Sequence, residues 1–283
     1  MYTLIVENKY GEQLELTHNI AYEIMSIEGL DPPDSTINKT HNADFDGSTY
    51  NSSYMNERVI TITMAINGPA EANRINLYHY FKTKFPVRLY YKNGVRNVYI
   101  DGYIQSMPIS FFEKKQIVQI VIMCPEQHFN GASANVQAFT SVSSLFEFPF
   151  SIEAAGEVFS SLAAESEQSI LNNGDVETGM VINIHATGAV TNPKIYNTTT
   201  GEHIFINQSL SSGDRIVVNT IKGQKSITLY PTGGGSSNII GKFVQGSSWL
   251  QLIPGDNVSI VTADNNPENM EVYFEITDQY EGV

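Results

Sequence analysis

The sequence contains a single cysteine, Cys124, among its 283 residues. One thiol cannot form an internal disulfide, and it leaves every cysteine-based zinc cluster short of ligands. Such a chain fits a reducing cytoplasm, where structural disulfides are rare. Its stability must therefore come from packed apolar cores, and 283 residues allow two cores of ordinary size.

Basic residues are also scarce, with 16 Lys and Arg against 30 Asp and Glu and a net charge of −14. Residues 1–136 carry 11 basic and 14 acidic groups, whereas residues 137–283 carry 5 and 16. The two halves thus have net charges near −3 and −11. An acidic half repels phosphate, so we expect no readout of nucleic acid.

The chain lacks any apolar run near the roughly 18 residues that a membrane-spanning helix needs. Its first residues, Met1 to Glu7, have no basic segment before their apolar run and no small-residue cleavage site. They are expected to form a first strand and not a signal peptide. We therefore expect no membrane insertion.

What the chain has in quantity is 15 Tyr, 14 Phe and 21 Gly, a composition that favours strands and turns. Strict alternation over Val59–Ile66 predicts a half-buried strand. Asn67-Gly68-Pro69 offers a helix start, and Ala72, Ile75, Tyr78 or His79, and Lys82 repeat at helical spacing, which predicts a helix ending near Phe85. Asn93-Gly94 between residues 87–91 and 98–104 predicts a hairpin with a tight type I′ turn. The nearly unbroken apolar run over residues 117–123 predicts a central strand.

The stretch from Asn130 to Ser144 is small and uncharged, which indicates a domain boundary. Beyond it, short apolar segments recur at roughly 8 to 12 residue spacing under turn signals, as in a β-sandwich. We therefore predict a β-dominated fold with two sandwich domains, residues 1–135 with one helix and a long arm, and residues 136–283.

The arm is the segment from Glu28 to Asn56, which is crowded with Asp, Asn, Ser, Gly and Pro. Compact domains rarely keep about thirty such residues unless they contact something, so a partner-binding arm or hairpin is predicted. Its proposed subunit-contact residues are Asp34, Asp46, Tyr50 and Tyr54.

Two patterns are candidate chemical sites. Asn42, Asp44 and Asp46 before Gly47 match the opening of an EF-hand calcium loop, but position twelve is Ser53, so a turn whose side chains bond their own backbone is the alternative. Trp249 is either a sugar-stacking residue or a packed aromatic. No G-x-S-x-G motif or short metal-ligand spacing of histidines occurs, so neither catalysis nor a cofactor is expected.

An ordered series of phrases resembles the distal tail protein family of siphophages. The first half of the chain contributes Gly29-Leu30-Asp31-Pro32-Pro33, Asp46-Gly47-Ser48, Arg58, Glu71-Ala72-Asn73-Arg74, Gly102-Tyr103-Ile104 and Cys124-Pro125. The second half contributes Phe148-Pro149-Phe150, Asn173 to Gly179, Asn192-Pro193, Gly213-Asp214, Ser248-Trp249, Pro254 to Asn257 and Tyr280 to Val283.

The resemblance implies a structural virion protein at the distal end of a long non-contractile tail. Its first domain would form a homo-hexameric ring, and its second would be peripheral and galectin-like or carbohydrate-module-like. Implied partners are the tail tube protein, the tape measure protein, a tail-associated hub or fibre protein and a receptor-binding protein. The implied location is the virion tail tip, after assembly in the host cytoplasm. The alternatives are a carbohydrate-binding adhesin acting through the second domain and, as a third reading, a polysaccharide hydrolase.

Overall fold

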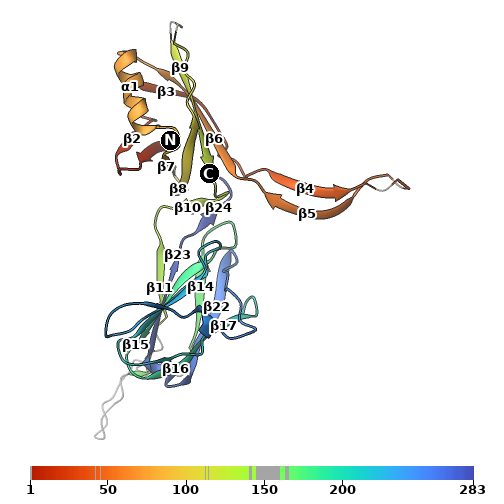
Figure 1. Cartoon of the computed structure of the whole chain (residues 1–283), viewed down its shortest axis with the longest axis vertical. Helices are drawn as coiled ribbons and strands as arrows, with labels where there is room; N and C mark the ends of the chain where they lie inside the picture. The colour runs from red at the N-terminus through yellow and green to blue at the C-terminus, as the bar shows by residue number, and fades with distance from the viewer. Residues whose placement is uncertain are drawn as a thin grey trace, which may run out of the picture. The chain divides into compact units, whose positions relative to one another are not determined.

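The computed structural model of the chain describes residues 2–41, 43–44, 46–111, 113, 115–139, 142–144, 160–162 and 166–283. It contains two compact units, Met1–Ala132 with Gln279–Val283, and Ser133–Asp278 (Figure 1). Antiparallel strands dominate both, and one α-helix occurs in the described residues. The predicted β-dominated fold class is therefore confirmed. No helix in these residues is long and apolar enough to cross a membrane.

The first unit is built on one nine-stranded antiparallel sheet. Seven strands follow the order β2-β1-β7-β8-β9-β6-β3, β10 pairs with β8, and β24 pairs with β10. The strands are β1 (Thr3–Asn8), β2 (Gln13–Glu15), β3 (Tyr22–Glu28), β6 (Arg58–Ile66), β7 (Pro86–Lys92), β8 (Asn97–Ser106), β9 (Gln116–Cys124), β10 (Phe129–Gly131) and β24 (Gln279–Tyr280). A separate hairpin joins β4 (Ser35–Thr40) to β5 (Thr49–Met55).

Alternating apolar residues explain why this sheet forms. Ile60, Ile62 and Met64 of β6 are fully buried, while Thr61 and Thr63 point to the other face. Residues of β1, β6, β7, β8 and β9 share one core cluster, so the sheet buries one apolar face within the unit. The helix α1 (Ala70–Tyr80) packs on the same core through Leu77.

Two details of the first unit differ from the sequence predictions. The hairpin β7–β8 forms, but Lys92 pairs with Asn97 and Gly94 does not adopt a positive φ, so the type I′ turn was wrong. Instead, the Asn93 side chain accepts hydrogen bonds from two backbone amides of a four-residue loop. The helix also forms, yet the face predicted from Ala72, Ile75 and Tyr78 is exposed, because Leu77 and Phe81 supply the buried contacts.

The second unit has two main antiparallel sheets that enclose a core of their own. One contains β11 (Asn135–Phe139), β23 (Met270–Ile276), β15 (Met180–Ala186), β19 (Arg215–Asn219), β20 (Ser226–Tyr230) and β21 (Ser237–Asn238). The other contains β14 (Ser166–Asn172), β22 (Gly255–Asn265), β16 (Val190–Asn197), β17 (Glu202–Phe205) and β18 (Ser209–Leu210). The remaining elements are β12 (Val142–Ser144), β13 (Ser160–Leu162) and the 3-10 turns η1 (Ile240–Lys242) and η2 (Pro267–Asn269).

The second unit is an insertion in the first. Phe129 of β10 pairs with Tyr280 of β24, and the chain between these strands makes the whole of the second unit. The last five residues therefore belong to the first unit, whereas the sequence prediction placed them in a domain covering 136–283. Local patterns carry no information on such a pairing, because its two strands lie about 150 residues apart in the sequence.

Candidate functional site

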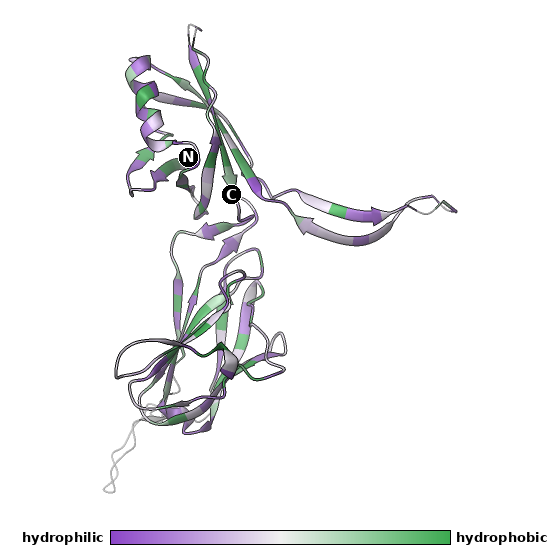
Figure 2. Cartoon of the chain, in the orientation of Figure 1, coloured by the Kyte–Doolittle hydropathy of each residue, from purple (hydrophilic) through white to green (hydrophobic). Residues whose placement is uncertain are grey.

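Within the arm, β4 and β5 form a hairpin whose described residues are largely exposed. Its two strands pair only with each other, from Ser35 opposite Met55 to Thr40 opposite Thr49 (Figure 1). Every residue of β5 is exposed, and the hairpin is coloured mainly white to purple by hydropathy in Figure 2. An isolated two-stranded hairpin is marginally stable in water, so this one is suited to gain stability from a partner.

Large side chains gather on this otherwise polar hairpin. Tyr50, Tyr54 and Ile37 are each more than half exposed, and Met55 is 41% exposed. Asn38 pairs with Ser52 and Lys39 with Tyr50, so one extra residue of β5 lies between Tyr50 and Tyr54 and the two rings lie on opposite faces of the hairpin. Tyrosine is enriched at protein interfaces because it buries a large apolar ring and keeps a polar group at its tip.

The arm begins from a rigid root. Gly29 has a φ of +86°, and a Cβ atom there would lie 2.1 Å from the carbonyl oxygen of Val59, so only glycine fits. At the end of the arm, the amide of Asn56 donates to the carbonyl of Asp34 at 3.3 Å. The two chain segments that enter and leave the arm are thereby held together.

Arg58, the first residue of β6, binds the backbone of this root. Arg58 is only 3% exposed, and its guanidinium donates to four backbone carbonyls at 2.5–2.8 Å. The acceptors are Gly29 and Asp31 before the arm, Gln127 after β9, and Glu281 in the C-terminal segment. The cation also lies 4.6 Å from the centre of the Phe129 ring. Burial lowers the pKa of Arg58, and these carbonyl contacts hold the charge that burial disfavours.

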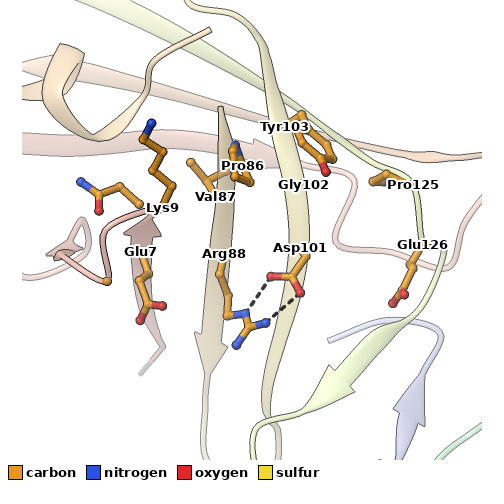
Figure 3. A pocket seen from close by; sticks show the side chains of 12 residues that line it. Glu7, Lys9, Pro86, Val87, Arg88, Asp101, Gly102, Tyr103, Pro125 and Glu126 are labelled. Carbon is orange, nitrogen blue, oxygen red and sulfur yellow. Dashed lines mark hydrogen bonds and ion pairs between the residues drawn. The ribbon is translucent and has the colours of Figure 1, made fainter. Parts of the chain in front are cut away.

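A cavity of about 490 Å³ opens at the outer face of the same unit (Figure 3). Its charged lining residues are Glu7 and Lys9 around β1, Arg88 on β7, Asp101 on β8 and Glu126 after β9. Figure 3 shows Arg88 and Asp101 turned toward each other from neighbouring strands. The Arg88 guanidinium binds the Asp101 carboxylate through two hydrogen bonds of 2.7 and 2.9 Å, which raises the pKa of Arg88.

The other charges of this cavity are also partnered. Glu7 accepts from Gln13 at 2.6 Å, Glu126 accepts from Asn130 at 3.1 Å, and the Lys9 ammonium lies 3.9 Å from the centre of the Phe85 ring. The cavity is thus lined by charges of both signs that have partners within the unit.

The four predicted contact residues lie in different parts of the arm. Asp34 lies at the root, Tyr50 and Tyr54 lie along β5, and Asp46 lies in the connecting loop; all four are exposed. Their role in subunit contact stays a prediction.

The calcium prediction falls partly outside the described residues, because Asn42 is not among them. Asp44 and Asp46 are exposed, and no group of three potential metal ligands occurs in the part of the chain that the structure describes.

Trp249 lies against the core of the second unit and stacks on Phe243 with ring centres 4.8 Å apart and planes inclined by 21°. Lys225 approaches the indole at 5.7 Å. The indole thus takes part in packing, and a sugar contact there stays a prediction.

Sequence reasoning missed the role of Arg58 and the lining of the cavity. Arg58 contributes to the family resemblance alone, although an arginine at the start of a strand rich in apolar residues is a usable signal. The cavity residues come from strands that are far apart in the sequence and form no motif.

Comparison with known proteins gives two findings. Residues 173–277, which lie within the second unit, match the family of siphovirus-type tail components, C-terminal domain. A search of curated proteins by sequence finds no match.

Three solved structures share the fold over nearly the whole chain. The SPP1 Dit (gp 19.1) protein, described as a paradigm of the hub adsorption apparatus in phages that infect Gram-positive bacteria, is 13% identical, with a TM-score of 0.68 and 99% of each chain covered. Chains of the phage p2 baseplate in its activated conformation follow. The structure with Ca is 11% identical with a TM-score of 0.55 over 100% of each chain, and that with Sr is 9% identical with 0.51 over 98%. The predicted resemblance to siphophage distal tail proteins is confirmed by the family match and the shared fold.

Proposed function

We propose that this chain, whose second unit carries the C-terminal domain of siphovirus-type tail components, is a structural hub protein at the distal end of a long phage tail. The observation that carries the proposal is the likeness to the SPP1 hub protein, which extends over 99% of both chains and includes both units. A fold shared over one domain alone would support much less, since single folds serve many functions.

In this proposal, six copies form a closed ring through their first units. A ring needs a head-to-tail interface between two different surfaces of the chain. The arm supplies one such surface, because it is exposed, carries two exposed tyrosines along β5 and pairs with no other strand of its own unit. The other surface lies on the body of the neighbouring first unit.

Charge favours the same division of roles. The first half of the chain has a net charge near −3, so copies of it meet at little electrostatic cost. The second half has a net charge near −11, and six such domains would repel one another if packed closely. The galectin-like or carbohydrate-module-like character expected for the second domain stays a prediction.

The ring would join the tail tube protein and the tape measure protein on one side to a tail-associated hub or fibre protein and a receptor-binding protein on the other. This places the protein at the virion tail tip, after assembly in the host cytoplasm. Its role is structural and does not require catalysis.

The test is the mass of the full chain in solution, measured by mass photometry with and without the arm. We expect a species of six times the 31.4 kDa chain. In the variant, Ser35–Met55 is replaced by a short Gly-Ser link, which the contact between Asp34 and Asn56 allows. We expect this variant to be monomeric and still folded by circular dichroism, because the arm contributes no residue to the buried core.

The matched control is the double substitution of Tyr78 and Phe111 by serine, which removes two exposed aromatic rings elsewhere on the same unit. We expect this variant to keep its assembly. A monomeric full chain at micromolar concentration would refute the ring, and a hexameric arm-less variant would refute the arm's part in it.

A further inference from the structure

An apolar groove of about 240 Å³ lies beside β3, at the edge of the sheet of the first unit. Met25, Ile27 and Leu30 line one side of it. Tyr2 and Tyr91 line the other side, and their rings stack with centres 5.9 Å apart. Met25 is 56% exposed, so apolar surface in this groove faces solvent.

The strand beside the groove has a free edge. β3 is the last strand of the sheet, and among the strands that the structure describes it pairs with β6 alone. Such an edge presents backbone donors and acceptors that can pair with a further strand. A bulge at Met25 interrupts β3, and Glu23 and Glu28 are its charged residues. Bulges and charges discourage pairing with arbitrary strands, so the edge is open chiefly to a strand that matches it.

The arm has an apolar face of matching character. Ile37 and Lys39 of β4 share one face of the hairpin by alternation, and Tyr50 lies opposite Lys39. Met55 lies on this face too, because its partner in β4 is two positions before Ile37. Three of the four large exposed side chains of the arm thus lie together, whereas Tyr54 lies on the other face.

The arm does not fill the groove of its own chain. Its strands extend away from the sheet to which β3 belongs, and its large side chains are exposed (Figure 1). The outer edges of β4 and β5 are also unpaired, since these strands pair only with each other. One chain therefore carries an apolar face between two free strand edges and, apart from it, an apolar groove beside a third.

The charges of the two surfaces are complementary. Lys39, on the apolar face of the arm, is the one Lys or Arg in residues 31–57. β3 carries two glutamates and no basic residue. Glu23 is paired with Lys115 at 2.6 Å, but Glu28 is exposed and forms no ion pair with a residue that the structure describes. Opposite charges across an interface fix its register and disfavour other partners.

We propose that the groove beside β3 receives the apolar face of the arm of a second copy, which adds a strand at the free edge of β3 and brings Lys39 to Glu28. The inference rests on the proposed ring and names its acceptor surface. Strand addition supplies backbone hydrogen bonds, and pockets for side chains supply specificity. Because arm and groove are different surfaces, each copy can give its arm to one neighbour and receive the arm of the other.

The first test is disulfide cross-linking on the full chain. Cys124 is buried, so introduced cysteines are the exposed thiols. A disulfide needs Cβ atoms about 3.5–4.5 Å apart and therefore reports direct contact. Met25→Cys combined with Ile37→Cys should give, after oxidation with copper phenanthroline, a ladder of linked chains up to the hexamer on non-reducing gels. The matched control is Met25→Cys with Tyr54→Cys, whose second thiol lies on the opposite face of the arm and should give at least tenfold less linked product.

The second test reverses the charges. Lys39→Glu and Glu28→Lys should each raise the dissociation constant of the assembly roughly tenfold in mass photometry, and the double reversal should restore it. All these residues are exposed, and circular dichroism should show every variant folded.

The proposal is overturned if a hexamer forms without the cross-link between positions 25 and 37, or if that disulfide forms within one chain. It is also overturned if the control pair links equally well, or if the double reversal assembles no better than the single variants. Mass photometry before oxidation separates these outcomes from a failure of the ring itself, since an unsubstituted chain that is monomeric throughout removes both proposals.

Discussion

Substitution of Arg58 tests whether a single buried cation holds together the root of the arm and the C-terminal segment. Arg58→Ala removes four charge-assisted hydrogen bonds, each worth roughly 1.5–3 kcal/mol, from carbonyls in three chain segments. The gross sum is offset by the desolvation cost of the guanidinium and by water that enters the space. We expect a net loss of about 3–5 kcal/mol in the free energy of unfolding of the first unit.

For a unit of this size, such a loss corresponds to a fall of roughly 10–20 °C in thermal midpoint. Differential scanning calorimetry at one fixed protein concentration should show the transition of the first unit moving and that of the second unit unchanged. Arg58→Lys should give a thermal midpoint between those of the unchanged chain and Arg58→Ala. An ammonium has three N–H donors on one nitrogen, so it cannot replace four hydrogen bonds that a guanidinium makes to three chain segments.

Arg88→Ala is the matched control, since it removes an arginine from the same sheet. The Arg88 and Asp101 side chains are 39% and 55% exposed, and exposed ion pairs are worth about 0–1 kcal/mol. If Arg58→Ala lowers the midpoint by no more than Arg88→Ala, the buried contacts of Arg58 do not carry the stability assigned to them.

Three further predictions concern the C-terminal segment, the buried thiol and the calcium motif. Deleting residues 279–283 should lower the thermal midpoint of the first unit alone, as calorimetry would show. A chain in which Ala132 is joined to Gln279 through two glycines should instead fold and assemble, as calorimetry and mass photometry would show. If this joined chain is unfolded, the second unit is not a simple insertion in the first. Burial raises the pKa of Cys124 to about 12, so between about pH 9 and 12 the unfolded state releases a proton that the folded state keeps. The free energy of unfolding should therefore fall as the pH rises, by up to about 1.4 kcal/mol per pH unit more than in Cys124→Ala. Urea titrations of both chains at each pH would show the difference. Adding a chelator should leave the thermal midpoint unchanged, and a drop of several degrees on calcium removal would instead support a site at Asp44 and Asp46.

The sequence predicted those parts of the fold that short-range physics determines. Alternation located β6, the apolar run located β9, and the proline at the first turn located α1. It failed where the choice depended on distant residues. Ile75 and Leu77 are both apolar, and only the position of the sheet decides that Leu77 is buried while Ile75 is 59% exposed.

The candidate sites follow the same division. The arm was predictable because its composition cannot support a core, so its exposure is a local property. The cavity of Figure 3 was not, because Arg88 and Asp101 meet only after β7 and β8 pair in register. An arginine that binds carbonyls of Gly29 and Glu281 likewise depends on contacts that span most of the chain.

The insertion of the second unit between β10 and β24 has an evolutionary consequence. Both ends of the inserted segment leave the first unit at one place, where Asn130 pairs with Gln279. Recombination that exchanges the gene segment for Ser133–Asp278 would therefore leave the pairing of these strands and the carbonyl contacts of Arg58 intact. Selection can then alter the size and charge of the inserted domain in one event, while the first unit, with the surfaces proposed for assembly, is inherited unchanged.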